Sequence, residues 1–387
     1  RGLRFTSGYA AAAICSPTRA SIVTGQSPAK VRITTFLPGR GDTVAQMLQH
    51  PIINQQLPAN VPTFAELLRA MGFATGYIGK WHLAGYAVKP LRDHFPDRHG
   101  FQINIAGCEK GLPPTYFDPY KIPTLPDRKK GEYLPDRLAD EAVKFIEAHR
   151  DKPFFLYLSH YTVHTPIQPK SELIEKYKKK KPEGSQKSAA YAAMVEGMDQ
   201  AVGTVLDKLD ELKLTEDTVV VFFSDNGGFL QQTNNEPLRA GKAWLYEGGI
   251  RVPMIVRYPK KTPRGGACDA PVISNDFFPT LVELAGLEAK PDEAPDGKSL
   301  APLLDGKGTI ERETLYWHFP HYTVHVPSSA IREGNYKLIE NLTTGGIELY
   351  DLEKDLSEEI DLAESMPKKV AELRAKLDDW RKDVGAR

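Results

Sequence analysis

A chain of 387 residues with 41% apolar composition is long enough for one large domain with a sizeable core and a smaller second domain. Its 50 lysines and arginines balance 50 aspartates and glutamates, which excludes a basic nucleic-acid binder and an acidic tail. No apolar run approaches the roughly 18–20 residues that a membrane-spanning helix needs, so no membrane span is expected.

Strands and helices are predicted to alternate along most of the chain. In chain order the predicted elements are a helix at 61–72, a strand at 74–82, a helix at 138–150, a strand at 153–164, a helix at 188–212, and strands at 218–228 and 252–259. The strand runs are almost continuously apolar, which is typical of strands buried on both faces of a sheet. We therefore predict an α/β fold with a large, mixed, mostly parallel sheet flanked by helices.

Beyond residue 310 the pattern changes to short strands separated by turns, followed by a terminal helix at 366–384. This change predicts two domains, residues 1–310 and residues 311–387, the second a small antiparallel sheet with a covering helix. Within the first domain, the run KYKKKK at 176–181 is interpreted as the solvated end of a helix, with a polyanion-binding edge as the alternative.

The stretch CSPTRASIVTG at 15–25 places a cysteine four residues before an arginine. The chain has only three cysteines, Cys15, Cys108 and Cys268, so a disulfide framework does not explain Cys15. A lone thiol beside Arg19 is a nucleophile, a metal ligand or a buried small residue. The last of these is the default, because free cysteine is among the most buried residue types.

Five sequence blocks change this interpretation. A C-x-P-x-R match alone is weak, because residue frequencies produce it by chance. The blocks follow one another as CSPTRxxxxTG at 15–25, GFATGYIGKWH at 72–82, HTP at 164–166, SDNGG at 224–228 and RAGKAWLYEGGIRVP at 239–253. Together they resemble the type I sulfatase family, of the alkaline-phosphatase-like superfamily, over nearly the whole chain. The first two blocks match the two signature patterns of that family closely.

The resemblance gives Cys15 a role. In that family this cysteine is oxidised to Cα-formylglycine by a separate formylglycine-generating enzyme, which reads Pro17 and Arg19. The hydrated aldehyde offers two geminal hydroxyls, one to attack sulfur and one to expel sulfate. The resemblance thus implies a sulfuric ester hydrolase, arylsulfatase-like, that works through a covalent sulfo-enzyme intermediate.

The resemblance also assigns the cationic residues. A sulfate ester is anionic and its leaving oxygen gains charge, so the pocket should be positively charged. By resemblance, Lys80 and Lys242 contact the sulfate and Arg19 steadies the hydrated aldehyde. His82 would take the proton that lets sulfate leave, and His164 would bind sulfate and protonate the departing alcohol. Taken singly, each of these residues is more simply a surface charge or a core histidine, and only the ordered blocks overturn that interpretation.

Asp225 and Asn226 are oxygen donors at a strand end, which suits calcium. In the family, an earlier strand ends in two aspartates that complete the calcium site. That strand would precede residue 1, so we expect an upstream β-branched strand ending in Asp-Asp, preceded by an export signal, and a catalytic domain incomplete at its N-terminus. A periplasmic or extracellular location and a sulfated small molecule or glycan as substrate follow from the resemblance.

Other interpretations stay open at this point. A phosphoesterase or phosphonate hydrolase of the same superfamily would share the metal pair. A non-catalytic, sulfated-glycan-binding relative would keep the pocket but lack a complete metal site. His318, His321 and His325 would hold a metal, form an aromatic rim to a substrate cleft, or be core and surface histidines.

Overall fold

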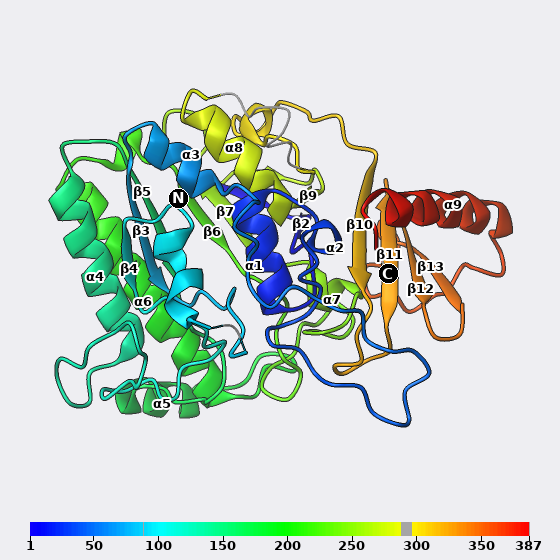
Figure 1. Ribbon diagram of the computed structural model, residues 1–387, viewed down its shortest axis with the longest axis horizontal. Coiled ribbons are helices and arrows are strands. Elements are labelled where there is room, and N and C mark those ends of the chain that lie inside the picture. The colour runs from blue at the N-terminus through cyan, green and yellow to red at the C-terminus, as the bar shows by residue number, and fades with distance from the viewer. Residues whose placement is uncertain (88, 288–295, 387) are drawn as a thin grey trace. The chain divides into compact units, whose positions relative to one another are not determined.

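The computed structural model describes residues 1–87, 89–287 and 296–386 (Figure 1). Its chain divides into two compact units. The first unit comprises Arg1–Val61, Val220–Arg257 and Lys261–Arg387, and the second comprises Pro62–Val219 and Tyr258–Lys260. The predicted boundary at residue 310 stays a prediction. None of the described helices combines the length and the apolar character that crossing a bilayer would require.

The first unit contains a four-stranded mixed sheet in the order β6-β7-β1-β8. The β6–β7 and β7–β1 pairs are antiparallel, and the β1–β8 pair is parallel. Two further short strands, β2 and β9, pair in parallel. The strands are β1 (Leu3–Phe5), β2 (Gly8–Tyr9), β6 (Val220–Phe223), β7 (Met254–Arg257), β8 (Ala267–Cys268) and β9 (Val272–Ile273). The helices of this part are α1 (Cys15–Thr24), α2 (Pro28–Val31), α7 (Glu247–Ile250) and α8 (Phe277–Leu284), with short 3-10 turns at Ser274–Asp276 and Ala301–Leu303.

Helix α1 is buried on every side, which is why its sequence shows no amphipathic pattern. Several of its hydroxyl side chains bond to backbone carbonyls instead of to water. The Thr18 hydroxyl donates to Ala12 O at 2.9 Å, and the Thr24 hydroxyl donates to Ala20 O at 2.7 Å. The helix ends at Gly25, whose left-handed conformation, with φ 69°, suits a residue without Cβ.

The C-terminal part of the first unit is an antiparallel meander covered by one helix, as predicted. Strands β10 (Thr314–Phe319), β11 (Ser328–Glu333), β12 (Tyr336–Asn341) and β13 (Ile347–Asp351) pair in sequence order. Helix α9 (Pro367–Asp383) lies along this sheet (Figure 1). Leu373 and Leu377 of the helix are fully buried in one apolar cluster with Ile331, Leu338 and Leu349 of the strands.

The second unit is built on a parallel sheet in the order β4-β3-β5. Its strands are β3 (Ala74–Gly79), β4 (Ile103–Ile105) and β5 (Phe154–Ser159), and its helices are α3 (Phe64–Ala70), α4 (Leu134–His149), α5 (Ser171–Lys178) and α6 (Ala189–Glu211). Short 3-10 turns occupy Leu91–His94, Pro96–Arg98 and Thr215–Asp217. Helix α4 packs so tightly on β3 that a Cβ at Gly76 would come within 2.6 Å of the Phe145 ring.

The mixed α/β fold class is confirmed, but burial differs among the strands. Central β3 is buried throughout, as predicted. The expectation of two buried faces is wrong for β5 and β6, which are edge strands of their sheets with mostly half-buried side chains. Val221 of β6 is 36% exposed. An edge strand lacks one neighbour, so an apolar run alone does not determine how deeply its side chains are buried.

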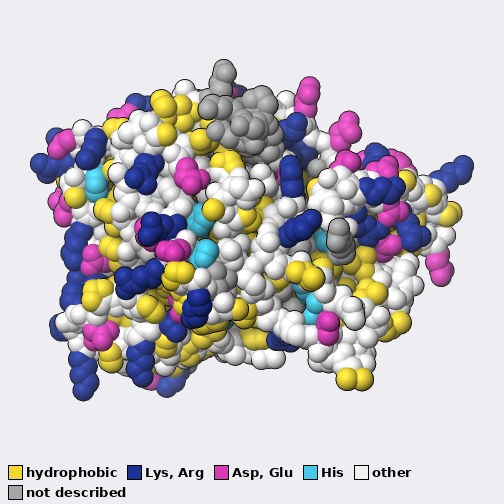
Figure 2. Space-filling view, viewed as in Figure 1, with side chains coloured by type: hydrophobic (Ala, Val, Ile, Leu, Met, Phe, Trp, Pro, Cys, Tyr) yellow, Lys and Arg dark blue, Asp and Glu magenta, His cyan; other side chains and the backbone are white. Residues whose placement is uncertain are grey.

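The lysine-rich run lies at the end of α5 and in the turn that follows it. Lys176 pairs with Glu196 at 2.6 Å and Lys178 pairs with Glu175 at 2.7 Å. Lysine and arginine side chains gather at the edge where α4 and α5 lie (Figure 2). Cations at a helix C-terminus are favoured by the helix dipole, so a solvated helix end is enough to explain why lysines gather in this run.

Candidate active site

Cys15 is the first residue of α1. Ile14 before it is extended, with φ −151° and ψ 162°, so the backbone turns from extended to helical at the cysteine. The side chain is only 3% exposed. The first turn contains no acidic residue, so the positive end of the helix dipole at residue 15 is not compensated locally. The structure describes all three cysteines, and no disulfide joins any of them.

Arg19 lies four residues after Cys15, on the same face of α1. It is 7% exposed. Its Nε donates to Asp225 Oδ2 at 2.9 Å, and its Nη2 lies 2.8 Å from the same oxygen. This double contact fixes the guanidinium beside the start of the helix and ties Asp225, two residues after the end of β6, to α1. Two sequence blocks 206 positions apart thus meet through one ion pair.

The segment that carries Lys242 is anchored by its backbone. Lys242 N–H donates to Gly228 O at 3.0 Å, and Ala243 N–H donates to Ala13 O at 2.8 Å. Ala240 and Ala243 both adopt positive φ, 59° and 72°. Such conformations are unfavourable for residues with Cβ and tend to occur at functional sites. The first unit therefore gathers five of the predicted residues: Cys15, Arg19, Asp225, Asn226 and Lys242.

Asn226 supplies the feature that bears on a metal. Its Nδ2 donates to Gly227 O at 2.9 Å, while its Oδ1 is buried and has no hydrogen-bond partner among the described residues. A buried oxygen without a donor is costly unless a ligand satisfies it. This carbonyl and the Asp225 carboxylate are the oxygen types that calcium prefers. Among the described residues no group of three or more histidines, cysteines or acids could hold a metal, so this pair is at most part of a ligand set.

Lys80 leaves the end of β3 in a clamped conformation. Its N–H donates to Ser159 O at 2.7 Å, and its carbonyl accepts from the Ser159 hydroxyl at 2.8 Å and from the Tyr77 hydroxyl. Gly79 is required just before it, with φ +111° and with its would-be Cβ only 1.8 Å from Ser159 O. The carboxyl ends of parallel β3 and β5 therefore fix the backbone of this lysine. Lys80 is buried, with 3% of its surface exposed.

His82 is held in a strained backbone conformation with φ 56°. Its N–H donates to Cys108 O at 3.1 Å. Its ring lies against Gly111, where a Cβ would come within 2.4 Å of the imidazole. The loop that contains Cys108 and Gly111 thus places the ring, and no local sequence signal connects residues so far apart.

His164 lies in the loop after β5. Its N–H donates to Tyr161 O at 3.1 Å, and its Nδ1 is 3.0 Å from Thr165 O. Donation from Nδ1 to that carbonyl leaves Nε2 as the basic nitrogen of the neutral ring. The Tyr161 hydroxyl donates to Ala106 O at 3.0 Å, in the loop that also holds His82. The second unit therefore gathers Lys80, His82 and His164 at one end of its sheet.

His160 also lies beyond the end of β5, as His164 does. Both His160 ring nitrogens are buried without a partner among the described residues. Burial lowers the pKa of His160 to about 4, so the ring is neutral near pH 7. That the residue groups of the two units face one pocket stays a prediction.

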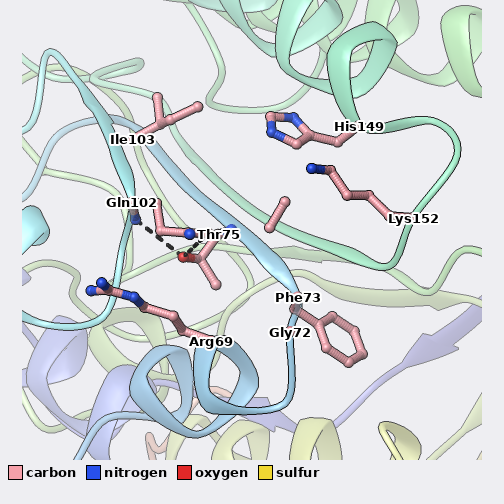
Figure 3. A pocket seen from close by; sticks show the side chains of 9 residues that line it. Arg69, Gly72, Phe73, Thr75, Gln102, Ile103, His149 and Lys152 are labelled. Atoms are coloured by element: carbon pink, nitrogen blue, oxygen red, sulfur yellow. Dashed lines mark hydrogen bonds between the residues drawn. The ribbon is translucent and has the colours of Figure 1, made fainter.

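The second unit also contains a cavity of about 200 Å³. It lies at the amino end of β3, opposite to the end that carries Lys80, and Arg69, His149 and Lys152 surround it (Figure 3). Arg69 lies in the last turn of α3 and Lys152 lies just after α4, where the negative ends of the helix dipoles favour cations. The cavity is therefore not part of the candidate active site.

The three C-terminal histidines differ from one another. His318 is buried and shares a hydrogen bond with the Ser329 hydroxyl at 2.7 Å. His321 is buried against the Thr34 hydroxyl at 2.8 Å. Both are core histidines. His325 is half-buried and stacks on Trp244, with ring centroids 3.8 Å apart. The metal interpretation fails, because these rings belong to no metal-binding group among the described residues.

Comparison with known proteins shows the family to which the chain belongs. Residues 1–287 match the family model described as Sulfatase. Residues 240–383 match the model described as N-sulphoglucosamine sulphohydrolase, C-terminal. The chain belongs to the sulfatase family. It is thus a sulfatase with the alkaline-phosphatase-like fold that the sequence predicted.

Individual relatives cover most of this sulfatase. A sulfatase of Formosa agariphila is 31% identical over 94% of this chain and 78% of its own length. The steryl-sulfatase of Rattus norvegicus is 30% identical over 82% of this chain and 67% of its own length. The crystal structure of Ps i-CgsB in complex with k-i-k-neocarrahexaose has a TM-score of 0.83 at 28% identity, and the match covers 98% of this chain and 84% of that one.

Proposed function

We propose that this sulfatase removes sulfate from a sulfated carbohydrate, with Cys15 converted to Cα-formylglycine as its nucleophile. The observation that carries the proposal is the position of Cys15 at the start of α1, one helical turn before a guanidinium that Asp225 holds with two contacts. A buried thiol needs no such arginine for packing. A reaction at residue 15 that develops negative charge does need a fixed cation beside it.

The modified side chain at position 15 would supply two geminal hydroxyls, one to attack sulfur and one to expel sulfate. During attack the first hydroxyl releases its proton to water and forms a new O–S bond while the S–O bond to the alcohol breaks, so negative charge moves onto the leaving oxygen. We assign its protonation to His164 in the imidazolium form, in which Nδ1–H donates to Thr165 O and Nε2–H gives its proton to the leaving oxygen. His82 takes the proton of the second hydroxyl when the aldehyde re-forms.

Fixed positive charge completes the proposed site. Lys80 and Lys242 would contact the sulfate oxygens, and Arg19 would keep its position beside residue 15 because Asp225 restrains it. Both lysines come from clamped backbone segments, so little order must be gained when substrate binds. Preorganised cations favour the transition state because they need not reorganise as charge develops.

Calcium is the proposed metal, held in part by Asp225 and Asn226. The buried, unpartnered Oδ1 of Asn226 supports this assignment. Calcium takes about six to eight oxygens, so further oxygens must come from substrate, water or other residues. The cation would add positive charge next to the sulfate.

The remaining assignments rest on the family and its relatives. Crystallisation of one relative with k-i-k-neocarrahexaose favours a carbohydrate as substrate. Sulfated glycans are extracellular materials, so we place the enzyme in the periplasm or outside the cell. A formylglycine-generating enzyme is its proposed maturation partner.

The test is hydrolysis by protein co-expressed with a formylglycine-generating enzyme. Wild type should release sulfate from sulfated sugars, and Cys15→Ala should lose at least about a thousandfold in kcat/KM. Cys268→Ala, at a half-buried cysteine on β8, is the matched control and should keep its activity. A preference for 4-nitrophenyl phosphate over 4-nitrophenyl sulfate would support a phosphoesterase instead. Binding of sulfated sugars without turnover would indicate a non-catalytic relative.

A further inference from the structure

A stacked aromatic pair lies beside the Cys15 segment in the first unit. The rings of Trp244 and His325 are 3.8 Å apart at an interplanar angle of 18°. Trp244 packs against the apolar cluster that includes Cys15, and it lies two residues after Lys242. The pair therefore borders the place where the proposed function puts the sulfate, on the side that the C-terminal loop around His325 covers.

The hydrogen-bonding atoms of this pair are unused within the protein. Trp244 Nε1 and both ring nitrogens of His325 have no hydrogen-bond partner in the described parts of the chain. Two other tryptophans behave differently: Trp317 Nε1 donates to Ala10 O and Trp81 Nε1 donates to His94 O, both at 2.9 Å. Neither Trp244 nor His325 is fully buried, so their polar edges are accessible to a ligand.

Charged groups near the pair are already engaged. The Arg239 guanidinium stacks on the Tyr246 ring at 3.9 Å and donates to the Tyr350 hydroxyl at 2.9 Å. Glu348 accepts from the hydroxyls of Tyr246 and Tyr350, both at 2.7 Å. Burial lowers the pKa of His325, and Arg239 lowers it further against the opposing effect of Glu348, so the ring is neutral near pH 7. A neutral imidazole favours hydroxyl groups over a second sulfate.

We propose that Trp244 and His325 bind the sugar ring that carries the sulfate, with His325 hydrogen-bonded to a neutral hydroxyl of that ring. This inference rests on the proposed function and names the group that recognises the alcohol. Aromatic faces alone would also fit a steroid, the substrate class named for one relative. The three open hydrogen-bonding atoms favour a hydroxylated ring, since an apolar ligand would leave them desolvated and unpaired.

The test compares His325→Phe, which keeps a stacked ring and removes both nitrogens, with His325→Ala, which removes the stack as well. Glucosamine 6-sulfate, N-acetylgalactosamine 4-sulfate and galactose 4-sulfate are the sugar probes, and 4-nitrophenyl sulfate is the aryl probe. The measured quantity is the ratio of kcat/KM for the sugar that wild type hydrolyses best to kcat/KM for the aryl probe. This ratio should fall about tenfold in His325→Phe, mainly because KM for the sugar rises, and it should fall further in His325→Ala. Trp380→Phe, at a stacked tryptophan on α9, is the matched control.

The outcomes separate this inference from the proposed function. An unchanged ratio in both His325 variants overturns only this inference. Wild-type turnover of the aryl probe with none of the sugars overturns this inference and the carbohydrate substrate of the proposed function, but it leaves the sulfatase reaction at residue 15 standing. Absence of sulfate release from every probe by matured wild type overturns the proposed function, and this inference with it. Circular dichroism and the urea midpoint confirm that each variant is folded before its ratio is compared.

Discussion

Replacement of Lys337 by methionine should destabilise the first unit strongly. Lys337 is fully buried, and its Nζ lies 2.9 Å from Glu247 and 2.8 Å from Glu358, both also fully buried. Methionine keeps the aliphatic stem but removes the ammonium. Each glutamate then loses a charged donor while it stays in the core, and the two carboxylates face each other without a cation between them.

The size of the stability loss depends on the hydrogen bonds and ion pairs that the two glutamates keep. Glu247 keeps the Tyr9 hydroxyl at 2.7 Å and Arg251 at 3.2 Å, and Glu358 keeps the backbone N–H of Glu247 at 2.7 Å. Removal of one partner from a buried ion pair typically costs about 3–5 kcal/mol. Burial already raises the pKa of Glu358, against the opposing effect of Lys337, so the variant should take up a proton there on folding. Its stability should therefore fall as pH rises from 5.5 to 8, about 3–5 kcal/mol below wild type at the upper end.

Urea unfolding followed by tryptophan fluorescence measures this loss. Lys354→Met is the matched control, because Lys354 is 79% exposed in its contact with Asp351 and its removal should leave the midpoint unchanged. Lys337→Met/Glu358→Gln should recover part of the stability, since it removes the carboxylate that is left without a cation, whereas Glu247 keeps Arg251. A Lys337→Met midpoint equal to that of the control would refute the reasoning.

Three further predictions follow from particular contacts. Gly111→Ala should lower kcat roughly 10–100-fold with little change in stability, because the added Cβ would displace the His82 ring. Gly203→Ala is the control and should keep wild-type kcat, because no atom lies within 4 Å of the Cβ that it adds. Asp225→Asn should weaken calcium binding in a calorimetric titration, because it removes a charged oxygen and the Arg19 ion pair; unchanged affinity would remove Asp225 from the ligand set. Burial lowers the pKa of His321 to about 3, with His50 and His318 adding to the effect. The unfolded chain then binds the extra proton first, so stability should drop as pH falls below about 6.5, and His321→Gln should reduce the drop between pH 7 and pH 5; an equal drop would contradict the assignment.

The sequence predicted those elements whose residue pattern repeats locally. Strand β3, helix α6 and the C-terminal meander agree with their apolar periodicity. Helix α1 was missed because it is buried on every side, so it has no polar face to create a period. The exposure of β5 and β6 depends on which strands neighbour them, and that is a property of the whole sheet.

The candidate site divides in the same way. Residue types at fixed spacing indicated Cys15 and Arg19, and the structure adds the Asp225 contact that holds the arginine. Contacts between distant segments could not be predicted. Gly111 lies against His82 from another loop, and His325 meets Trp244 across 81 positions. Such pairs leave no local pattern, because the three-dimensional fold alone brings them together.

The most direct test of the central claim is the mass of the tryptic peptide 5–19 from protein co-expressed with a formylglycine-generating enzyme. If residue 15 is the precursor of the nucleophile, the peptide should have the mass expected for an aldehyde, or its hydrate, in place of the thiol. The aldehyde form should be absent when the maturation enzyme is left out. An unmodified thiol at Cys15 in a preparation that hydrolyses sulfate esters at full rate would contradict the account.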